Sequence, residues 1–334
     1  MRLLVTGGAG FIGSNFVRLT GRVRPDTQIT VLDSFTYAAN EASLVDAQCD
    51  VIRGDVADRE TLDEILSGFG PNDAIVHFAA ESHNDNSIAA PGQFVHTNIT
   101  GTFEILEAAR RHDVRLHHVS TDEVYGDLPL GTPEAFTEDT AYRPSSPYSA
   151  SKASADMLVR AWIRTYGLRA TLSNCSNNYG PRQHVEKFIP RQITTLIDGG
   201  RPRLYGSGEN VRDWIHVDDH NAAVWEILER GRLGETYLIG ADGQASNREI
   251  VRELCLLCDR DPDEVDFVTD RPGHDRRYAI DATKLRRELG WAPEHTDLRS
   301  GLADTVEWYR GNREWWEPVK AAVEAKYAEV EEVL

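Results

Sequence analysis

The chain has 334 residues, of which 40% are hydrophobic and 27% charged, a composition typical of a folded protein with a sizeable core. Its net charge of −18 argues against nucleic acids and anionic membrane surfaces as partners, because both would be repelled. No apolar run approaches the roughly 20 residues that a membrane-spanning helix needs. Because the first residues already predict a strand, we expect no signal peptide and a cytoplasmic protein.

A glycine-rich turn near the N-terminus is the strongest local motif. The apolar run 3–5 predicts a strand and 14–18 the first turn of a helix, with Gly7, Gly10 and Gly13 between them. Such a turn receives the pyrophosphate of a dinucleotide at a helix N-terminus. Asp33 ends the next predicted strand, where a carboxylate would bond the adenosine ribose and repel a 2′-phosphate. The motif therefore predicts NAD rather than NADP.

The following segments continue the alternation of strands and helices. Residues 50–53 predict a third strand, 59–66 a helix, and 74–80 a strand that is buried on both faces of a parallel sheet. Asp55 follows the third strand and is interpreted as an adenine ligand or a helix N-cap. The polar residues 81–87 come directly after the buried strand, at the sheet edge where ligands bind in open α/β folds.

Two long helices complete the first half of the chain. They are predicted near 91–112 and over 147–166, with a strand at 116–119 between them. The alternation up to about residue 173 predicts a doubly wound parallel sheet of Rossmann type. We expect residues 1–173 to form this domain and 174–334 to form mainly a smaller α/β lobe, with a strand at 234–240 returning to the sheet. The tail, 315–334, predicts a solvated acidic helix.

One predicted helix carries Tyr148 and Lys152, which lie four residues apart and share a helix face. A lysine ammonium beside a phenol lowers the pKa of the phenol, which would make Tyr148 a competent base near neutral pH. Thr121 ends the preceding strand and would contact a substrate alcohol. The next two residues, Asp122 and Glu123, predict either an acid–base pair or a solvated turn or cap. Burial side by side would raise at least one of their pKa values.

The four cysteines predict neither a disulfide framework nor a metal site. Cys255 and Cys258 form a CxxC pair within an amphipathic helical pattern, and no second pair completes a zinc site. We therefore expect them to pack in the core and expect no metal.

These motifs together resemble the extended short-chain dehydrogenase/reductase family and, more narrowly, the dTDP-glucose 4,6-dehydratase family. The resemblance runs along nearly the whole chain, in segments such as TGGAGFIGS, HFAAESH, STDEVYG, SSPYSASKASAD, NCSNNYGP and RDWIHVDDH. The narrower resemblance depends mainly on 121–123, because relatives that only epimerise or reduce do not need two adjacent carboxyl groups there. Some members have Val and Arg where this chain has Asn84 and Asn86, a departure that we do not expect to alter the reaction.

The resemblance implies dehydration of dTDP-glucose to dTDP-4-keto-6-deoxyglucose on one tightly held NAD. Tyr148 would take the proton of the 4-hydroxyl, Glu123 the proton on carbon 5, and protonated Asp122 would donate to the departing 6-hydroxyl, with Thr121 and Lys152 completing the catalytic set. The implied NAD-binding residues are Gly7, Gly10, Phe11, Ile12, Gly13, Asp33, Ser34, Thr36, Asp55, Val56, Phe78, Ala79, Ala80, Thr97, Tyr148, Lys152 and Asn178. The implied substrate-binding residues are Ser82, Thr121, Asn177, Lys187, Phe188, Arg203, Tyr205, Arg212, Asn247, Arg271 and His274.

The family packs the helices at 91–112 and 147–166 as a four-helix bundle across a two-fold axis, which implies a homodimer. Other readings stay open at this point. The chain could be a 4-epimerase, a UDP-glucuronate decarboxylase or a dehydratase of UDP- or GDP-hexose, and product analysis would separate these. It could also be a nucleotide-sensing regulator without catalysis, which the joint presence of Tyr148, Lys152, Asp122 and Glu123 disfavours.

Overall fold

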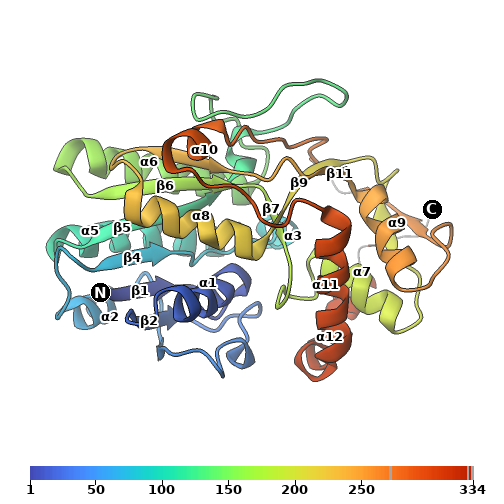
Figure 1. The fold of residues 1–334 in the computed structure, drawn as a ribbon, viewed down its shortest axis with the longest axis horizontal. Coiled ribbons are helices and arrows are strands. Elements are labelled where there is room, and N and C mark those ends of the chain that lie inside the picture. The colour runs from blue at the N-terminus through green and yellow to red at the C-terminus, as the bar shows by residue number, and fades with distance from the viewer. Residues whose placement is uncertain (271–272, 329–330, 332–334) are drawn as a thin grey trace.

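A computed structural model of the protein describes residues 1–270, 273–328 and 331. Within them, a seven-stranded parallel sheet lies at the centre (Figure 1). Its strands are β1 (Arg2–Thr6), β2 (Gln28–Asp33), β3 (Asp50–Arg53), β4 (Ala74–His77), β5 (Arg115–Thr121), β6 (Ala170–Cys175) and β10 (Thr236–Ile239). They are arranged in the order β10-β6-β5-β4-β1-β2-β3. The predicted doubly wound α/β fold of Rossmann type is confirmed.

The winding of the sheet reverses between β1 and β4. From β1 the chain adds β2 and β3 on one side, and it adds β4, β5 and β6 on the other. Val5 in β1 lies opposite Val31 in β2 and Val76 in β4. The carboxyl ends of the strands at such a reversal leave a crevice, where ligands bind in open α/β sheets.

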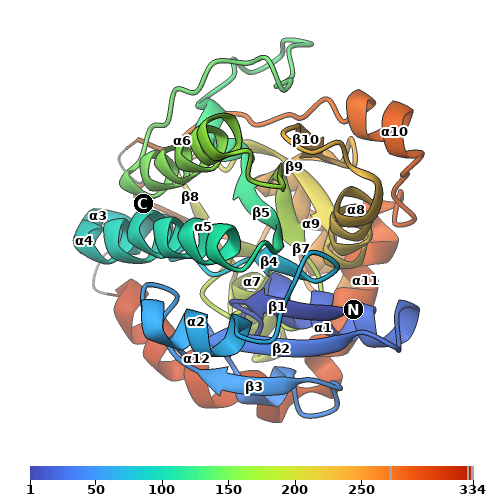
Figure 2. The ribbon, with the colours of Figure 1, turned by 90° about the vertical axis from the view of Figure 1, so that its left-hand side faces the viewer.

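Helices cover both faces of the sheet, as Figure 2 shows. Those on one face are α2 (Arg59–Leu66), α5 (Thr102–Arg111) and α6 (Pro147–Tyr166), and those on the other are α1 (Phe11–Val23) and α8 (Val217–Arg230).

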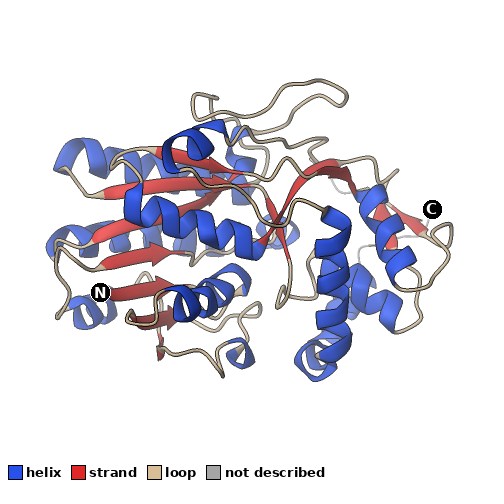
Figure 3. Cartoon of the chain, viewed as in Figure 1, coloured by secondary structure: helices blue, strands red, loops and turns tan. Residues whose placement is uncertain are grey.

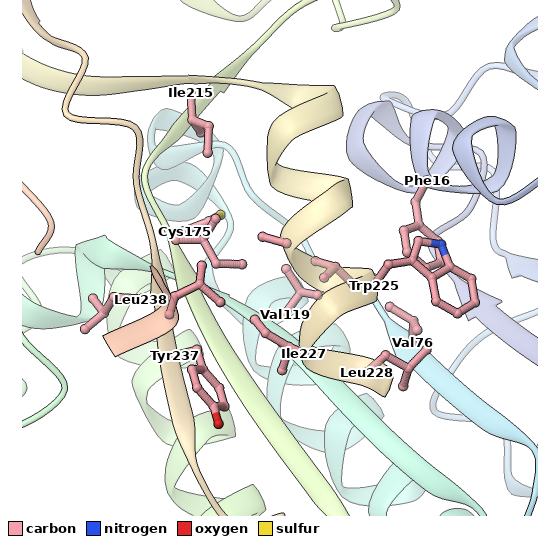
Figure 4. Close-up of a cluster of buried hydrophobic side chains, with 14 of the residues drawn as sticks. Phe16, Val76, Val119, Cys175, Ile215, Trp225, Ile227, Leu228, Tyr237 and Leu238 are labelled. Atoms are coloured by element: carbon pink, nitrogen blue, oxygen red, sulfur yellow. The ribbon is translucent and has the colours of Figure 1, made fainter. Parts of the chain in front are cut away.

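The core lies on both sides of the sheet, which explains the continuous apolar runs of the strands. In β1, Leu3 and Val5 belong to one buried cluster and Leu4 to the cluster on the opposite face. Figure 4 shows the first cluster, in which Phe16 of α1 stacks on Trp225 of α8 with ring centroids 5.5 Å apart. Alternate side chains of one strand therefore hold the two helical layers together.

Local sequence signals fix the ends of α6. The side chain of Ser146, the N-cap, accepts a hydrogen bond from the backbone N–H of Ser149 at 3.0 Å, and the Ser149 hydroxyl accepts one from the N–H of Ser146 at 2.9 Å. This capping box satisfies two N–H groups of the helix start. Pro147 occupies the first helical position, where an N–H is not needed. Gly167, with φ of 67°, ends the helix.

The helix predicted near 91–112 is not a continuous α-helix. It consists of α4 (Pro91–Phe94), a π-helical segment (Val95–Gly101) and α5. The side chain of Asn98, in the π-helical segment, accepts from the N–H of Glu81 at 2.8 Å and donates to the Ser151 hydroxyl at 2.8 Å. The segment is thus tied both to the chain after β4 and to α6, a local distortion of the kind often found at functional sites.

The remaining elements build a smaller lobe and its connections to the sheet. β7 (Asn177–Tyr179), β9 (Val211–His216) and β11 (Gln244–Ser246) form a three-stranded sheet, and β8 (Arg203–Tyr205) pairs with β12 (Asp266–Val268). The other helices are α3 (Asn84–Ala89), α7 (Phe188–Ile197), α9 (Asn247–Leu257), α10 (Thr283–Leu289), α11 (Leu298–Gly311) and α12 (Arg313–Ala328). Figure 3 shows α7, α9 and α11 grouped to one side of the central sheet.

The prediction of a solvated helix for the tail is wrong for one face of α12, and residues 329–330 and 332–334 of the tail lie outside the described residues. Trp316 of α12 is fully buried, and Tyr327 is almost so. Beyond the helix, the carboxylate of Glu331 is buried and accepts hydrogen bonds from Arg191 at 2.6 and 2.9 Å and from Arg203 at 3.0 Å. An acidic residue can be buried here because two guanidinium groups pair with it.

Across the described part of the chain, no helix combines the length and the apolar character needed to cross a membrane. The same residues contain no cluster of three or more His, Cys, Asp or Glu side chains suited to a metal ion. Cys255 is buried in α9, as expected from the amphipathic pattern, and Cys258 directly after it is partly buried.

Candidate active site

A cavity of about 780 Å³ opens at the carboxyl ends of the parallel strands. It extends from the turn between β1 and α1, past the ends of β2 and β4, to the end of β5 and the start of α6. Its volume lies in the range of sites for small molecules and cofactors. Every residue that the resemblance implies for NAD binding lines this cavity.

The glycine turn forms a backbone cradle at one end of the cavity. Gly7 has φ of 69°, and a Cβ added there would lie 2.7 Å from the backbone of Ala79. A Cβ on Gly13 would lie 2.3 Å from the carbonyl oxygen of Gly7. The helix α1 begins at Phe11 after Gly10, a residue with no side chain to cap the first N–H groups. These residues therefore fit a pyrophosphate at a helix N-terminus.

Two predicted cofactor carboxylates lie beside this cradle. Asp33 accepts hydrogen bonds from the N–H groups of Ala9 at 2.9 Å and Phe35 at 2.8 Å, and burial raises its pKa above the usual range. The Asp55 carboxylate accepts a hydrogen bond from the N–H of Ala57 at 2.8 Å, and its Oδ2 lies 2.9 Å from Nε2 of His96. The alternative that Asp55 caps the following helix is wrong, because Asp58 is the N-cap of α2.

Tyr148 and Lys152 lie at the other end of the cavity, on the first two turns of α6. The Lys152 ammonium donates to the carbonyl oxygen of Val119 in β5 at 2.8 Å. Burial, then the carboxylate of Glu123, raises the pKa of Tyr148 well above its usual value, and a hydrogen bond with Thr121 opposes this shift. The expected lowering of the Tyr148 pKa by Lys152 is therefore not found, because burial dominates and the ammonium is engaged by the strand.

The adjacent carboxyl groups have different surroundings. Asp122 is 1% exposed, and burial, followed by the charges of Glu123 and Asp213, raises its pKa well above the usual range. The prediction that one of the two pKa values is raised is confirmed. Glu123 lines the cavity, whereas Asp122 is not among the described residues that line it. The Thr121 hydroxyl links the pair, since it donates to Asp122 and accepts from the N–H of Glu123, both at 3.3 Å. A buried carboxyl group with a raised pKa and a carboxyl group that lines the cavity thus follow β5 directly.

The predicted substrate residues are divided between the cavity and the smaller lobe. Ser82, Thr121, Asn177 and Lys187 line the cavity, and the Lys187 ammonium donates to the Ser82 carbonyl oxygen at 2.8 Å. Arg271 lies outside the described residues. The other described members of the set, which do not line this cavity, are Phe188, Arg203, Tyr205, Arg212, Asn247 and His274.

Comparison with known proteins identifies the family. The chain matches the family model described as GDP-mannose 4,6 dehydratase over residues 4–305. It is 62% identical over 332 residues to the dTDP-glucose 4,6-dehydratase of Mycobacterium tuberculosis (strain CDC 1551 / Oshkosh), covering 98% of this chain and 99% of that protein. This chain belongs to the dTDP-glucose 4,6-dehydratase family, among the extended short-chain dehydrogenases/reductases.

Solved structures of the dehydratase family have the same fold. The dTDP-glucose 4,6-dehydratase of Streptomyces venezuelae, with NAD and dTDP bound, is 49% identical with a TM-score of 0.90, over 96% of this chain and 100% of that one. The Bacillus anthracis str. Ames dTDP-glucose 4,6-dehydratase in complex with NAD is 43% identical with a TM-score of 0.87, over 96% and 99% of the two chains.

The dehydratase cavity also contains residues that the motifs did not single out. They include Tyr37, Gln93, His96, Gln183 and His184. Burial, with the charges of Lys187 and Lys326, lowers the pKa of His184 to about 4, so its imidazole is neutral at physiological pH. These residues lie in loops, in the four-residue helix α4 and in the π-helical segment, where no periodic pattern marks them. For Tyr37, Gln183 and His184, the available signal was their nearness in sequence to the motifs at 33–36 and 174–181.

Proposed function

We propose that this chain is an NAD-dependent dehydratase that converts dTDP-glucose to dTDP-4-keto-6-deoxyglucose. The observation that carries the proposal is the pair at the end of β5, where a carboxyl group with a raised pKa, Asp122, adjoins a carboxylate that lines the cavity, Glu123. Removal of water needs an acid and a base side by side, and two environments that separate their pKa values supply both. Membership of the family and the fit of the glycine cradle to a dinucleotide support the same reaction.

When bound, NAD supplies the acceptor for the hydride of carbon 4 and afterwards the donor of a hydride to carbon 6. The residues that would hold it are the backbone of the turn Gly7–Gly13 at the pyrophosphate, Asp33 at the adenosine ribose, and Tyr148 and Lys152 at the nicotinamide ribose. A cofactor that is regenerated in each cycle does not need to leave, so this cradle is expected to hold it tightly.

Tyr148 acts on the 4-hydroxyl. The raised pKa of its phenol means that the proton is lost only when positive charge is close by. The nicotinamide of NAD, when bound, would bring such a charge beside the phenol, and Lys152, one turn further along α6 and held by the carbonyl oxygen of Val119, would orient the nicotinamide ribose. The Thr121 hydroxyl forms a hydrogen bond with the phenol, which favours loss of the phenol proton. Tyr148 thereby takes the 4-hydroxyl proton as carbon 4 becomes a ketone.

Glu123 and Asp122 carry out the loss of water. The 4-ketone acidifies the hydrogen on carbon 5, and Glu123 takes this proton. Asp122, whose raised pKa favours its protonated form, turns from its buried position toward the cavity and gives its proton to the 6-hydroxyl, and the carbon–oxygen bond breaks to release water. The proton held by Glu123 then returns to carbon 5 as carbon 6 is reduced, and exchange with solvent returns a proton to Asp122 and removes the one on Tyr148. The product is the 4-keto-6-deoxy sugar nucleotide.

Incubation of the purified protein with dTDP-glucose and UDP-glucose in parallel tests this function, with identification of the sugar by NMR. We expect the 4-keto-6-deoxy sugar, formed faster from dTDP-glucose. A 4-epimer as the product, or no turnover of any nucleotide hexose, would contradict the proposed reaction. Faster turnover of UDP-glucose would contradict the proposed preference for the dTDP nucleotide.

We also propose a domain division and an assembly. Residues 1–173, together with β10, which pairs with β6, would form the NAD-binding domain, and 174–334 mainly the nucleotide-sugar lobe. A homodimer would form through α5 and α6, which lie side by side on one face of the sheet (Figure 2) and carry the exposed apolar side chains Phe103 and Met157. Four free thiols suit a reducing compartment and support a cytoplasmic location.

A further inference from the structure

Asn84, the first residue of α3, contacts the proposed base directly. Its side-chain amide donates to Oε2 of Glu123 at 2.9 Å. Its carbonyl oxygen accepts from the hydroxyl of Ser146 at 2.9 Å. Both ends of one half-buried amide are therefore occupied, by partners 39 and 62 residues away in the sequence.

The second partner connects Asn84 to the helix that carries Tyr148. Ser146 is the N-cap of α6 and shares a reciprocal pair of hydrogen bonds with Ser149. Tyr148 follows the cap by two residues. A continuous chain of hydrogen bonds thus runs from the carboxylate of Glu123 through Asn84 to the start of α6, and it fixes the base relative to the tyrosine.

We propose that Asn84 is a positioning residue for the removal of the proton on carbon 5. Its amide holds the carboxylate of Glu123 toward the cavity and at a set distance from Tyr148. The inference rests on the proposed role of Glu123 as the base and goes beyond it, since it names the residue that holds this base in place.

The chemistry of an amide suits this task. It is neutral, so it adds no charge beside the carboxylate, and it offers a donor and an acceptor at once. An aliphatic side chain of the same shape would leave Glu123 free to rotate. A carboxylate at this position would repel Glu123 and raise its pKa.

Single-turnover kinetics of the NAD-loaded enzyme with dTDP-glucose tests the proposal. The near-ultraviolet absorbance of reduced nicotinamide rises when carbon 4 is oxidised and falls after water is lost. We expect Asn84→Leu to leave the rate of the rise within about twofold of the wild type and to slow the fall by about tenfold, because only the second phase needs a well-placed base. Reduced nicotinamide should therefore accumulate in this variant, which the absorbance reports.

Asn84→Asp keeps the size and polarity of the side chain and gives a second, independent readout. We expect the acid limb of the pH profile for the falling phase to move to higher pH, because a neighbouring carboxylate raises the pKa of Glu123. Asn312→Asp is the matched control, since it makes the same change at an exposed residue directly after α11, whose side chain donates to the carbonyl oxygen of Trp308 and does not line the cavity. It should keep the pH profile of the wild type.

Equal slowing of both phases by Asn84→Leu, or no slowing of either, would overturn the proposal. So would an unchanged acid limb in Asn84→Asp, which remains informative if the leucine variant does not fold. Failure of the proposed function looks different, because the wild type itself would then form no 4-keto-6-deoxy product. If the wild type forms that product and both variants behave like it, only the role of Asn84 is refuted.

Discussion

At the scale of single residues, solvent contact separates two neighbouring carboxyl groups. Asp122 is buried and its pKa is raised, whereas Glu123 faces the cavity and accepts a hydrogen bond from Asn84. The turn that begins directly after Thr121 produces this difference, since successive residues of the turn leave the strand in different directions. In the proposed mechanism, identical chemical groups thereby acquire opposite roles in proton transfer.

Replacement of the base isolates the first half of the reaction. Glu123→Gln keeps the side-chain volume and removes the proton acceptor, so oxidation of carbon 4 should proceed while water loss slows by at least about 100-fold. Reduced nicotinamide would accumulate, which absorbance measures directly. Turnover at the wild-type rate would mean that Glu123 is not the base.

The raised pKa of Asp122 predicts a pH dependence of stability. Its folded-state pKa lies above the unfolded value of about 4, so the folded protein retains a proton that the unfolded chain has lost. The contribution to stability is full below about pH 4 and is lost as the pH rises toward the folded-state pKa, by about 1.4 kcal/mol per pH unit for one proton.

Asp122→Asn tests this prediction because its amide does not titrate. The free energy of unfolding, measured by urea titration across this pH range, should fall less steeply with pH in the variant than in the wild type. Identical slopes would show that Asp122 is not protonated in the folded protein.

At the scale of the elements, the turn between β1 and α1 depends on glycine for its shape. Gly7→Ala would force a positive φ on a residue with a Cβ and drive that Cβ against the backbone of Ala79. We expect a loss of about 1–3 kcal/mol in stability and a smaller rise of the melting temperature on addition of NAD.

Gly21→Ala is a suitable control for this substitution. Gly21 lies inside α1, where an added Cβ meets no heavy atom of the described residues within 4 Å. Alanine should stabilise that helix by about 0.5–1 kcal/mol and leave the effect of NAD unchanged. An equal rise of the melting temperature on addition of NAD in both variants would contradict the proposal that the glycine turn binds NAD.

The exposed apolar side chains of α5 and α6 predict the interface of a homodimer. Met157 on α6 is 48% exposed, and glutamate there would place a charge in the proposed two-fold interface. We expect Met157→Glu to shift the mass in light scattering from a dimer to a monomer. Leu256→Glu on α9, where the leucine is 40% exposed, makes the same chemical change elsewhere and should leave the dimer intact. A monomeric wild type would refute the interface.

At the scale of the whole molecule, local patterns and distant contacts differ in how far the sequence reveals them. The strands β1 and β4 were predictable because burial on both faces demands continuous apolar residues. The end of the cavity that is proposed to bind NAD could be located from the sequence because its glycines and Asp33 lie at a fixed spacing within one βαβ unit.

Contacts between distant segments were not predictable in the same way. The tail seemed polar in sequence, yet Glu331 is buried because Arg191 and Arg203 pair with it from another part of the chain. No periodic pattern in the sequence marks Asn84. Its contact with Glu123 arises only because α3 packs near the end of β5. The substrate end of the site is built from several such segments, so residue types alone mark it weakly.

The central claim is that a hydride leaves carbon 4 and returns to carbon 6 of the same sugar after an acid and a base have removed water. Isotopic transfer tests it most directly. A mixture of unlabelled dTDP-glucose and dTDP-glucose deuterated at carbon 4 is converted, and the products are analysed by mass spectrometry and NMR. We predict that each labelled molecule carries its own deuterium at carbon 6. Deuterium that remains at carbon 4, is lost to solvent, or is exchanged between molecules would contradict the claim.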